Sequence, residues 1–140
     1  YSGTLERMRA YVTSQARYRG GPHRGLVARL RDGETRLRSW IDLFFAGDVY
    51  ILGLDLDVSE IDLWWLLTYR ARLQVHRPDR VRGTVRYLHA RSVSGGGARQ
   101  RRKLELLEAT GVKLHGFERP DGDYGAFYER ALAWLSRRLR

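Results

Sequence analysis

Apolar residues recur along this chain at two spacings, one typical of helices and one typical of strands. Near the start they follow one another at steps of three and four residues, which predicts an amphipathic helix over residues 4–18. A Gly-Gly-Pro sequence at 20–22 is expected to end it. The apolar positions of this helix are Leu5, Met8, Tyr11 and Val12.

The next apolar segment alternates with charged residues in the manner of a half-buried strand, so we predict a strand over residues 36–45. Gly47 and Asp48 are typical of a turn. Residues 49–54 are short, β-branched and apolar, which is typical of a central strand buried on both faces. The segment is therefore expected to form two strands about a tight turn.

Residues 57–76 fit two structures. Ser59 followed by Asp62 is a helix-capping pattern, whereas the aromatic run that begins at Trp64 and Trp65 favours a strand. We predict a strand here.

Three further elements complete the pattern. Residues 84–88 form a short strand candidate, and residues 99–110 form a helix that Gly111 ends. Asp121 or Asp123 begins a last helix. Strands followed by helices indicate an α+β fold with a mixed β-sheet and packed helices.

Length and charge narrow the class of protein. The 140 residues are enough for one domain, residues 1–140, with a single core. Lys and Arg number 26 against 16 Asp and Glu, a net charge of +10, so the chain attracts polyanions such as nucleic acid or anionic lipid. Arginine far outnumbers lysine, which GC-rich coding also produces, so charge alone favours nucleic acid only modestly.

Several classes of site have no sequence support. There is no cysteine, no apolar run of the roughly 18 residues that span a membrane, and no phosphate-binding loop or nucleophile elbow. The histidines lack metal-ligand spacing, so we predict neither a metal nor a cofactor and assign them no role. The chain starts at Tyr1 and stops within an apolar pattern, so we expect a piece of a longer protein. The histidines are His23, His76, His89 and His115.

Two local features suit a planar ligand, and each has a structural alternative. Trp64 or Trp65 can stack on a base or fill the core; on a strand, neighbouring residues point to opposite faces, so only one would be in a one-sided core. The run Gly95–Gly97 can let backbone groups approach a ligand, or it can simply connect a strand to a helix.

The third feature is a cluster of basic residues in the first turns of the helix predicted over 99–110. Positive charge at the start of a helix opposes the helix dipole, so a polyphosphate partner would account for it. A solvated charged face is the alternative. Glu6 and Arg9 also form a Glu-x-x-Arg pair, which we interpret as a surface ion pair rather than a catalytic one. The basic cluster consists of Arg99, Arg101, Arg102 and Lys103.

The order and spacing of several short motifs resemble the amino-terminal domain of the ribosome-inactivating proteins, the ricin A-chain family of ribosomal RNA N-glycosidases. The phrase Asp48-Val-Tyr-Ile-Leu-Gly53 looks like the strand that precedes the adenine-binding turn of that family. The other similar stretches are Tyr1, Leu5, Arg9 and Tyr11 in the first helix, Arg86-Tyr-Leu, Gly95–Gly97, Lys103–Gly111 and Val112–Gly116.

The resemblance implies hydrolysis of one adenine N-glycosidic bond in large-subunit ribosomal RNA, and hence a toxin that inhibits translation. It implies an adenine pocket lined by Trp64, Trp65, Gly96 and Gly97, with the basic cluster on RNA phosphates. Arg101 stands where the family has its second stacking tyrosine. The family's later catalytic Glu-x-x-Arg helix has no counterpart, so no catalytic residue is assigned.

The implied partners are ribosomal RNA or the ribosome, and a carboxy-terminal domain of the same chain. Two alternatives stay open. One is a non-catalytic RNA-binding or protein-interaction domain, and the other is a basic domain with no nucleic-acid role. Release of free adenine distinguishes the enzyme from both.

Overall fold

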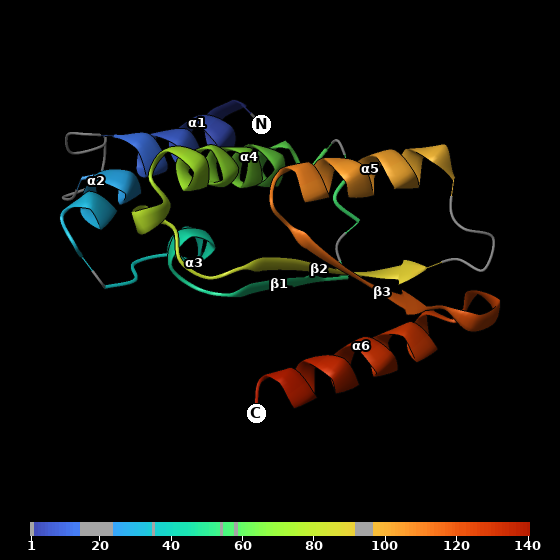
Figure 1. The fold of residues 1–140 in the computed structure, drawn as a ribbon. Helices are drawn as coiled ribbons and strands as arrows, with labels where there is room; N and C mark the ends of the chain where they lie inside the picture. Colours follow the sequence, from blue (N-terminus) through green and yellow to red (C-terminus); the bar gives the residue numbers. More distant parts are fainter. Residues whose placement is uncertain (1, 15–23, 35, 54, 58, 92–96) are drawn as a thin grey trace. The chain divides into compact units, whose positions relative to one another are not determined.

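The computed structural model describes residues 2–14, 24–34, 36–53, 55–57, 59–91 and 97–140. The chain forms two compact units (Figure 1). The helical unit comprises Tyr1–Asp48 and Asp55–Gly83, and the sheet unit comprises Val49–Leu54 and Thr84–Arg140. The helical unit contains α1 (Ser2–Thr13), α2 (Leu26–Arg31), α3 (Trp40–Ala46), α4 (Ile61–His76) and the 3₁₀ helix η1 (Pro78–Arg80). The sheet unit contains β1 (Val49–Leu52), β2 (Val85–Arg91), α5 (Ala98–Ala109), β3 (Lys113–Glu118), the 3₁₀ helix η2 (Pro120–Gly122) and α6 (Tyr124–Arg138).

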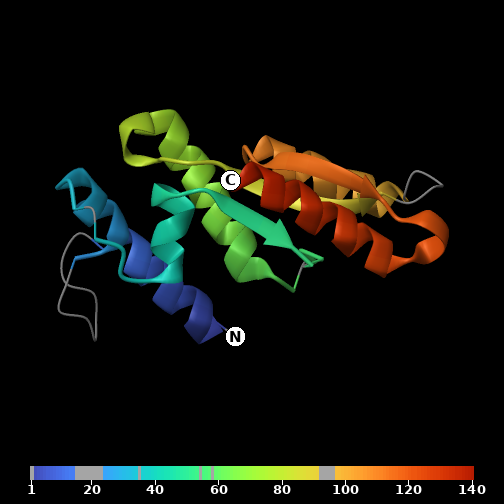
Figure 2. The same ribbon diagram turned by 90° about the horizontal axis from the view of Figure 1, so that it is seen from below.

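The sheet unit is built on a parallel three-stranded sheet in the order β1-β2-β3. Parallel neighbours need a crossover connection, which α5 provides between β2 and β3. Figure 1 shows α5 on one face of the sheet and α6 on the other, and Figure 2 shows α6 running along β3. On the α6 face, Leu88 of β2 packs with Phe127 and Ala131, all three being buried. This cluster fixes α6 against the sheet.

The helical unit has its own core. Helix α1 packs against α2 and α4, and α3 packs against α4 (Figure 1). Burial of apolar side chains between these helices supplies the main stabilising free energy of the unit. The largest fully buried side chains of the unit include Val12, Leu26, Phe45, Leu56, Leu66 and Leu67.

The strand predicted over residues 36–45 is wrong, because residues 40–46 form α3. Ser39 is the N-cap, and its Oγ accepts a hydrogen bond of 3.1 Å from the backbone N–H of Ile41. Trp40 and Phe44 interrupt the alternation of apolar and charged residues over 36–45. A helical turn brings these two residues together, with ring centroids 5.9 Å apart.

The strand predicted over residues 57–76 is also wrong, because residues 61–76 form α4. Its buried residues recur at helical spacing, which outweighs the strand preference of the aromatic run. They are Leu66, Leu67, Arg70 and Leu73.

The sheet differs from the prediction in two ways. Both described pairings are parallel, so this sheet is not mixed. The central strand is β2, whose residues Val85 to Leu88 are all buried, whereas β1, predicted to be central, lies at the edge. A short apolar run looks alike at either position, so the sequence could not distinguish them.

The other predicted elements are confirmed, as is the combination of helices and strands. The strand at 84–88 is β2, and the helix at 99–110 is α5. Asp123 is the N-cap of α6, with Oδ1 accepting a hydrogen bond of 2.8 Å from the N–H of Gly125. The first helix ends at Thr13, and its predicted Gly-Gly-Pro end lies outside the described residues.

Candidate nucleic-acid interface

The amino end of α5 lies at the edge of the sheet where its parallel strands end. In open sheets of parallel strands, ligands bind at this carboxyl edge, next to the helix that follows the strand. Gly97 is the N-cap of α5, with φ −77° and ψ 169°, and it has no side chain to cap the first N–H groups. The first turn of α5 also carries no acidic residue. The helix therefore begins in a positive field.

The predicted basic cluster lies on this end of α5. Arg99, Arg101 and Arg102 are exposed, and Lys103 is half-buried. Burial lowers the pKa of His89 on β2, and the positive charges of Arg91 and Lys103 lower that pKa further. Lys103 of α5 is thus close enough to β2 to affect His89.

Arg91, the last residue of β2, adds a cation that the sequence analysis did not identify. Its side chain lies across Gly116 of β3, where a Cβ would be only 2.7 Å from the Arg91 Cγ and Cδ atoms. Gly116 therefore leaves the space that the Arg91 stem occupies. A glycine inside a strand is a recognised signal of such close approach, and it was available in the sequence.

Arg119 and Tyr124 extend the same edge. The Arg119 N–H donates a hydrogen bond of 3.3 Å to the Arg91 carbonyl, which places Arg119 directly beside the end of β2. The Arg119 guanidinium carbon lies 4.5 Å from the centre of the Tyr124 ring, and that tyrosine is 55% exposed. The Arg119 Nε is buried and has no hydrogen-bond partner among the described residues. Arginine next to an exposed aromatic ring suits single-stranded RNA, whose bases stack on such groups.

The residues predicted to line an adenine pocket are distributed over both units. Trp64 and Trp65 belong to the helical unit, Gly97 belongs to the sheet unit, and Gly96 lies outside the described residues. Both tryptophans are half-buried on α4, where neighbouring side chains are about 100° apart, so the opposite-face argument for a strand does not apply.

Each tryptophan has a structural partner within its own unit. The Trp64 Nε1 donates to the carbonyl oxygens of Leu56 and Asp57, each at 3.3 Å. The Trp65 ring stacks on Tyr69, with centroids 5.2 Å apart. These contacts are sufficient to explain why both rings are held in place.

The described residues offer no metal centre, because no group of three or more His, Asp or Glu side chains in them is placed to hold an ion. The sequence assigns no role to the four histidines. His76 is exposed, His89 and His115 are half-buried, and His23 lies outside the described residues. None of the helices in the described ranges has the length and apolar character needed to cross a membrane. No family model, curated protein or solved structure matches the chain.

Proposed function

We propose that this chain binds ribosomal RNA, as the amino-terminal part of a ribosome-inactivating-protein-like N-glycosylase. One observation carries the proposal. Three exposed arginines, Arg99, Arg101 and Arg102, occupy the first turns of a helix that has no capping side chain and no acidic residue in its first turn.

This arrangement disfavours the isolated helix. Each cation near a helix amino terminus opposes the dipole and costs about 0.3 to 1 kcal/mol when exposed at low ionic strength. An RNA phosphate reverses the sign of that interaction, because it meets both the guanidinium groups and the positive helix end. Arg91 and Arg119 lie at the same edge and add to the phosphate-binding surface.

The sequence resemblance supports the ribosomal target. Its main motif, Asp48–Gly53, contains β1 and ends in Gly53, whose φ of 76° requires the freedom of glycine. The Lys103–Gly111 motif forms most of α5 and likewise ends in a glycine, with φ 82°. Each motif thus corresponds to one element and the turn that ends it. We further propose that the fold as a whole resembles the amino-terminal domain of that family.

The reaction of that family breaks the C1′–N9 bond of one adenosine. Water adds to the ribose carbon, and adenine leaves with a proton. The only Glu-x-x-Arg sequence in these residues is Glu6 to Arg9, and both side chains are exposed on α1. We therefore expect the 140-residue chain to bind RNA, and the adenine-releasing step to need a catalytic pair from further sequence.

Salt dependence of RNA binding tests the proposal. We would titrate a fluorescently labelled sarcin–ricin loop hairpin at several salt concentrations and compare the chain with R99A/R101A/R102A. Each lost phosphate contact should reduce the slope of log K against log salt by about 1. The matched control is R7A/R9A/R72A, which removes three exposed arginines from α1 and α4. Equal slopes for the two triple variants would falsify the assignment of α5.

The alternative function is a non-catalytic RNA-binding or protein-interaction domain, and the exposed positions of Glu6 and Arg9 on α1 are compatible with it. Chromatographic detection of free adenine after incubation with ribosomes separates the two functions. Adenine released by a longer form of the chain that carries a second Glu-x-x-Arg pair supports the enzyme. RNA binding without adenine release by that longer form leaves only the binding function.

A further inference from the structure

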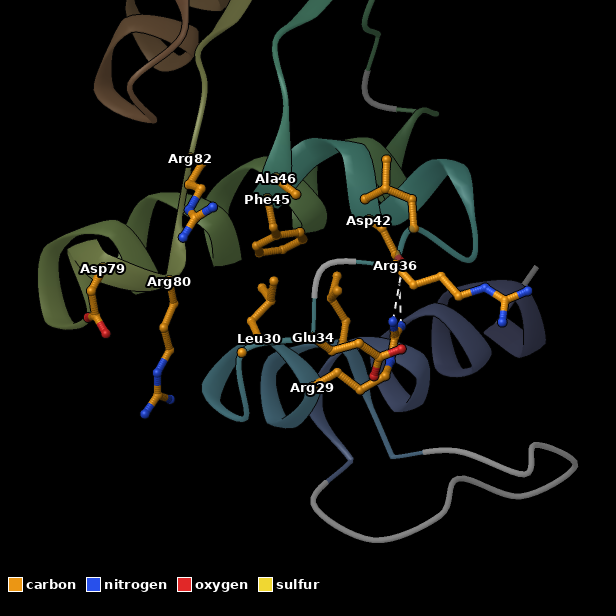
Figure 3. A pocket seen from close by; sticks show the side chains of 13 residues that line it. Arg29, Leu30, Glu34, Arg36, Asp42, Phe45, Ala46, Asp79, Arg80 and Arg82 are labelled. Atoms are coloured by element: carbon orange, nitrogen blue, oxygen red, sulfur yellow. Dashed lines mark hydrogen bonds and ion pairs between the residues drawn. The ribbon is translucent and has the colours of Figure 1, made fainter.

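The helical unit contains a hollow of about 190 Å³ between α2, α3, η1 and the segment that joins α2 to α3 (Figure 3). Leu30 and Leu37 line it with partly accessible apolar surface, and the fully buried Phe45 lies beside them. Figure 3 shows the Phe45 ring and the Leu30 side chain pointing toward each other. The hollow is therefore apolar in its middle.

Two of the acidic groups that line the hollow are already neutralised. Asp42 is paired with Arg29 at 3.2 Å, and Glu34 accepts a hydrogen bond of 2.8 Å from the Arg38 Nε. Neither carboxylate adds a free negative charge to the hollow. The charge of its rim is therefore decided by the remaining side chains.

Arg80 and Arg82 supply most of that remaining charge. No hydrogen bond or ion pair joins either guanidinium to another group in the part of the chain that the structure describes. Arg80 is the last residue of η1, and Arg82 follows two residues later. In Figure 3 both side chains lie on the same side of Phe45, and that of Arg80 extends away from Arg82. Among the described residues that line the hollow, Asp79 is the one acid left beside them, whereas Arg36 lies on the opposite side and points away. This side of the rim carries two cations against one anion.

We propose that the hollow binds a small organic anion with an apolar body, which lies against Leu30 and Leu37 while the positive charge of Arg80 and Arg82 at the rim attracts its carboxylate or phosphate. Apolar cavities of about 150 Å³ accept benzene, so this hollow has room for one ring. Guanidinium groups form paired hydrogen bonds with planar carboxylates and with phosphates. The site does not depend on the proposed RNA interface, which lies in the sheet unit.

Four probes separate the two parts of the recognition. Benzoate and phenyl phosphate carry both a ring and a negative charge, benzyl alcohol carries only the ring, and inorganic phosphate carries only the charge. We would follow backbone amide shifts of the whole chain by NMR during titration with each. We expect benzoate or phenyl phosphate to bind at least tenfold more tightly than either single-feature probe, with shifts at Leu30 and Leu37. Which of the two binds more tightly identifies the anionic group.

The variant R80Q/R82Q keeps polar side chains of similar length but removes both charges. It should weaken binding of the better anion by about tenfold, while R72Q/R77Q, which removes two exposed arginines of α4 and its C-cap, should not. An unchanged amide spectrum without ligand shows that the variants remain folded. The proposal is overturned if benzyl alcohol binds as well as benzoate, if no probe shifts Leu30 or Leu37, or if both double variants weaken binding equally.

Discussion

The hydroxyl of Tyr11 on α1 donates a hydrogen bond of 2.6 Å to the Asp42 carboxylate on α3. Arg29 of α2 completes the group, because its guanidinium donates to Asp42 at 3.2 Å and to the Tyr11 oxygen at 2.9 Å. Asp42 is 1% exposed and Arg29 is 5% exposed. The three helices are thus joined through one buried, fully hydrogen-bonded ion pair.

Replacement of Asp42 by Ala should destabilise the helical unit strongly. Removing one partner of a buried ion pair leaves the other charge without compensation, which costs about 3 to 5 kcal/mol. Urea unfolding monitored by circular dichroism measures the loss. Asp32 is the control: its pair with Arg24 is exposed, so Asp32→Ala should cost no more than about 1 kcal/mol. Similar losses of unfolding free energy for the two variants would show that the buried network stabilises the unit no more than an exposed ion pair does.

Acid should destabilise the sheet unit through His89. Burial lowers the pKa of His89 below its usual 6.5, and Arg91, Lys103 and His115 lower it further. Between the folded pKa and 6.5 the unfolded chain binds more protons, so stability falls as the pH falls through that interval. Unfolding free energies of the chain and of His89→Gln, measured from pH 7.5 to pH 5, test this. The variant should show a flatter profile.

The exposed His76 provides the control for this measurement. His76→Gln should retain the full pH dependence of the unfolding free energy. If both variants keep the same profile as the parent chain, His89 is not the group responsible.

Gly116→Ala should weaken RNA binding without contacting RNA. The new Cβ would be 2.7 Å from the Arg91 side chain, which must move away from its place across β3. We expect a severalfold loss of affinity for the hairpin, about the loss caused by Arg91→Ala. The double variant should lose little more than either single one, because both act through Arg91. Gly3→Ala, where a Cβ meets nothing within 4 Å, is the matched control.

The sequence predicted the elements whose ends are marked by local chemistry. Helix α6 has its Asp123 cap, and α5 has a glycine after its end, so both were found. Helices α3 and α4 were missed because aromatic residues that are usually read as strand formers lie at helical spacing, and packing against the helical core decides between the two. Local propensity alone does not contain that tertiary contribution.

The candidate interface also contains some residues that the sequence predicts and others that only the structure identifies. Arg99, Arg101 and Arg102 are neighbours in sequence, so the sequence alone predicts their cluster. Arg91 and Arg119 come together only because β2 and β3 are parallel neighbours that end at one edge. The Arg29 to Asp42 pair was invisible for another reason: charged residues are expected at the surface, and only the structure shows both of them buried.

Loss of the Asp123 cap should destabilise α6 and disturb the Arg119–Tyr124 contact at its start. Asp123 accepts hydrogen bonds from the N–H groups of Gly125 and Ala126, which otherwise have no partner inside the helix. Asp123→Ala should therefore cost about 1 kcal/mol, whereas Asp123→Ser should keep most of the stability because serine is also a good cap. Thermal unfolding of the three chains measures this order. An alanine variant as stable as the serine variant would show that α6 is held by its packing on Leu88 and not by its cap.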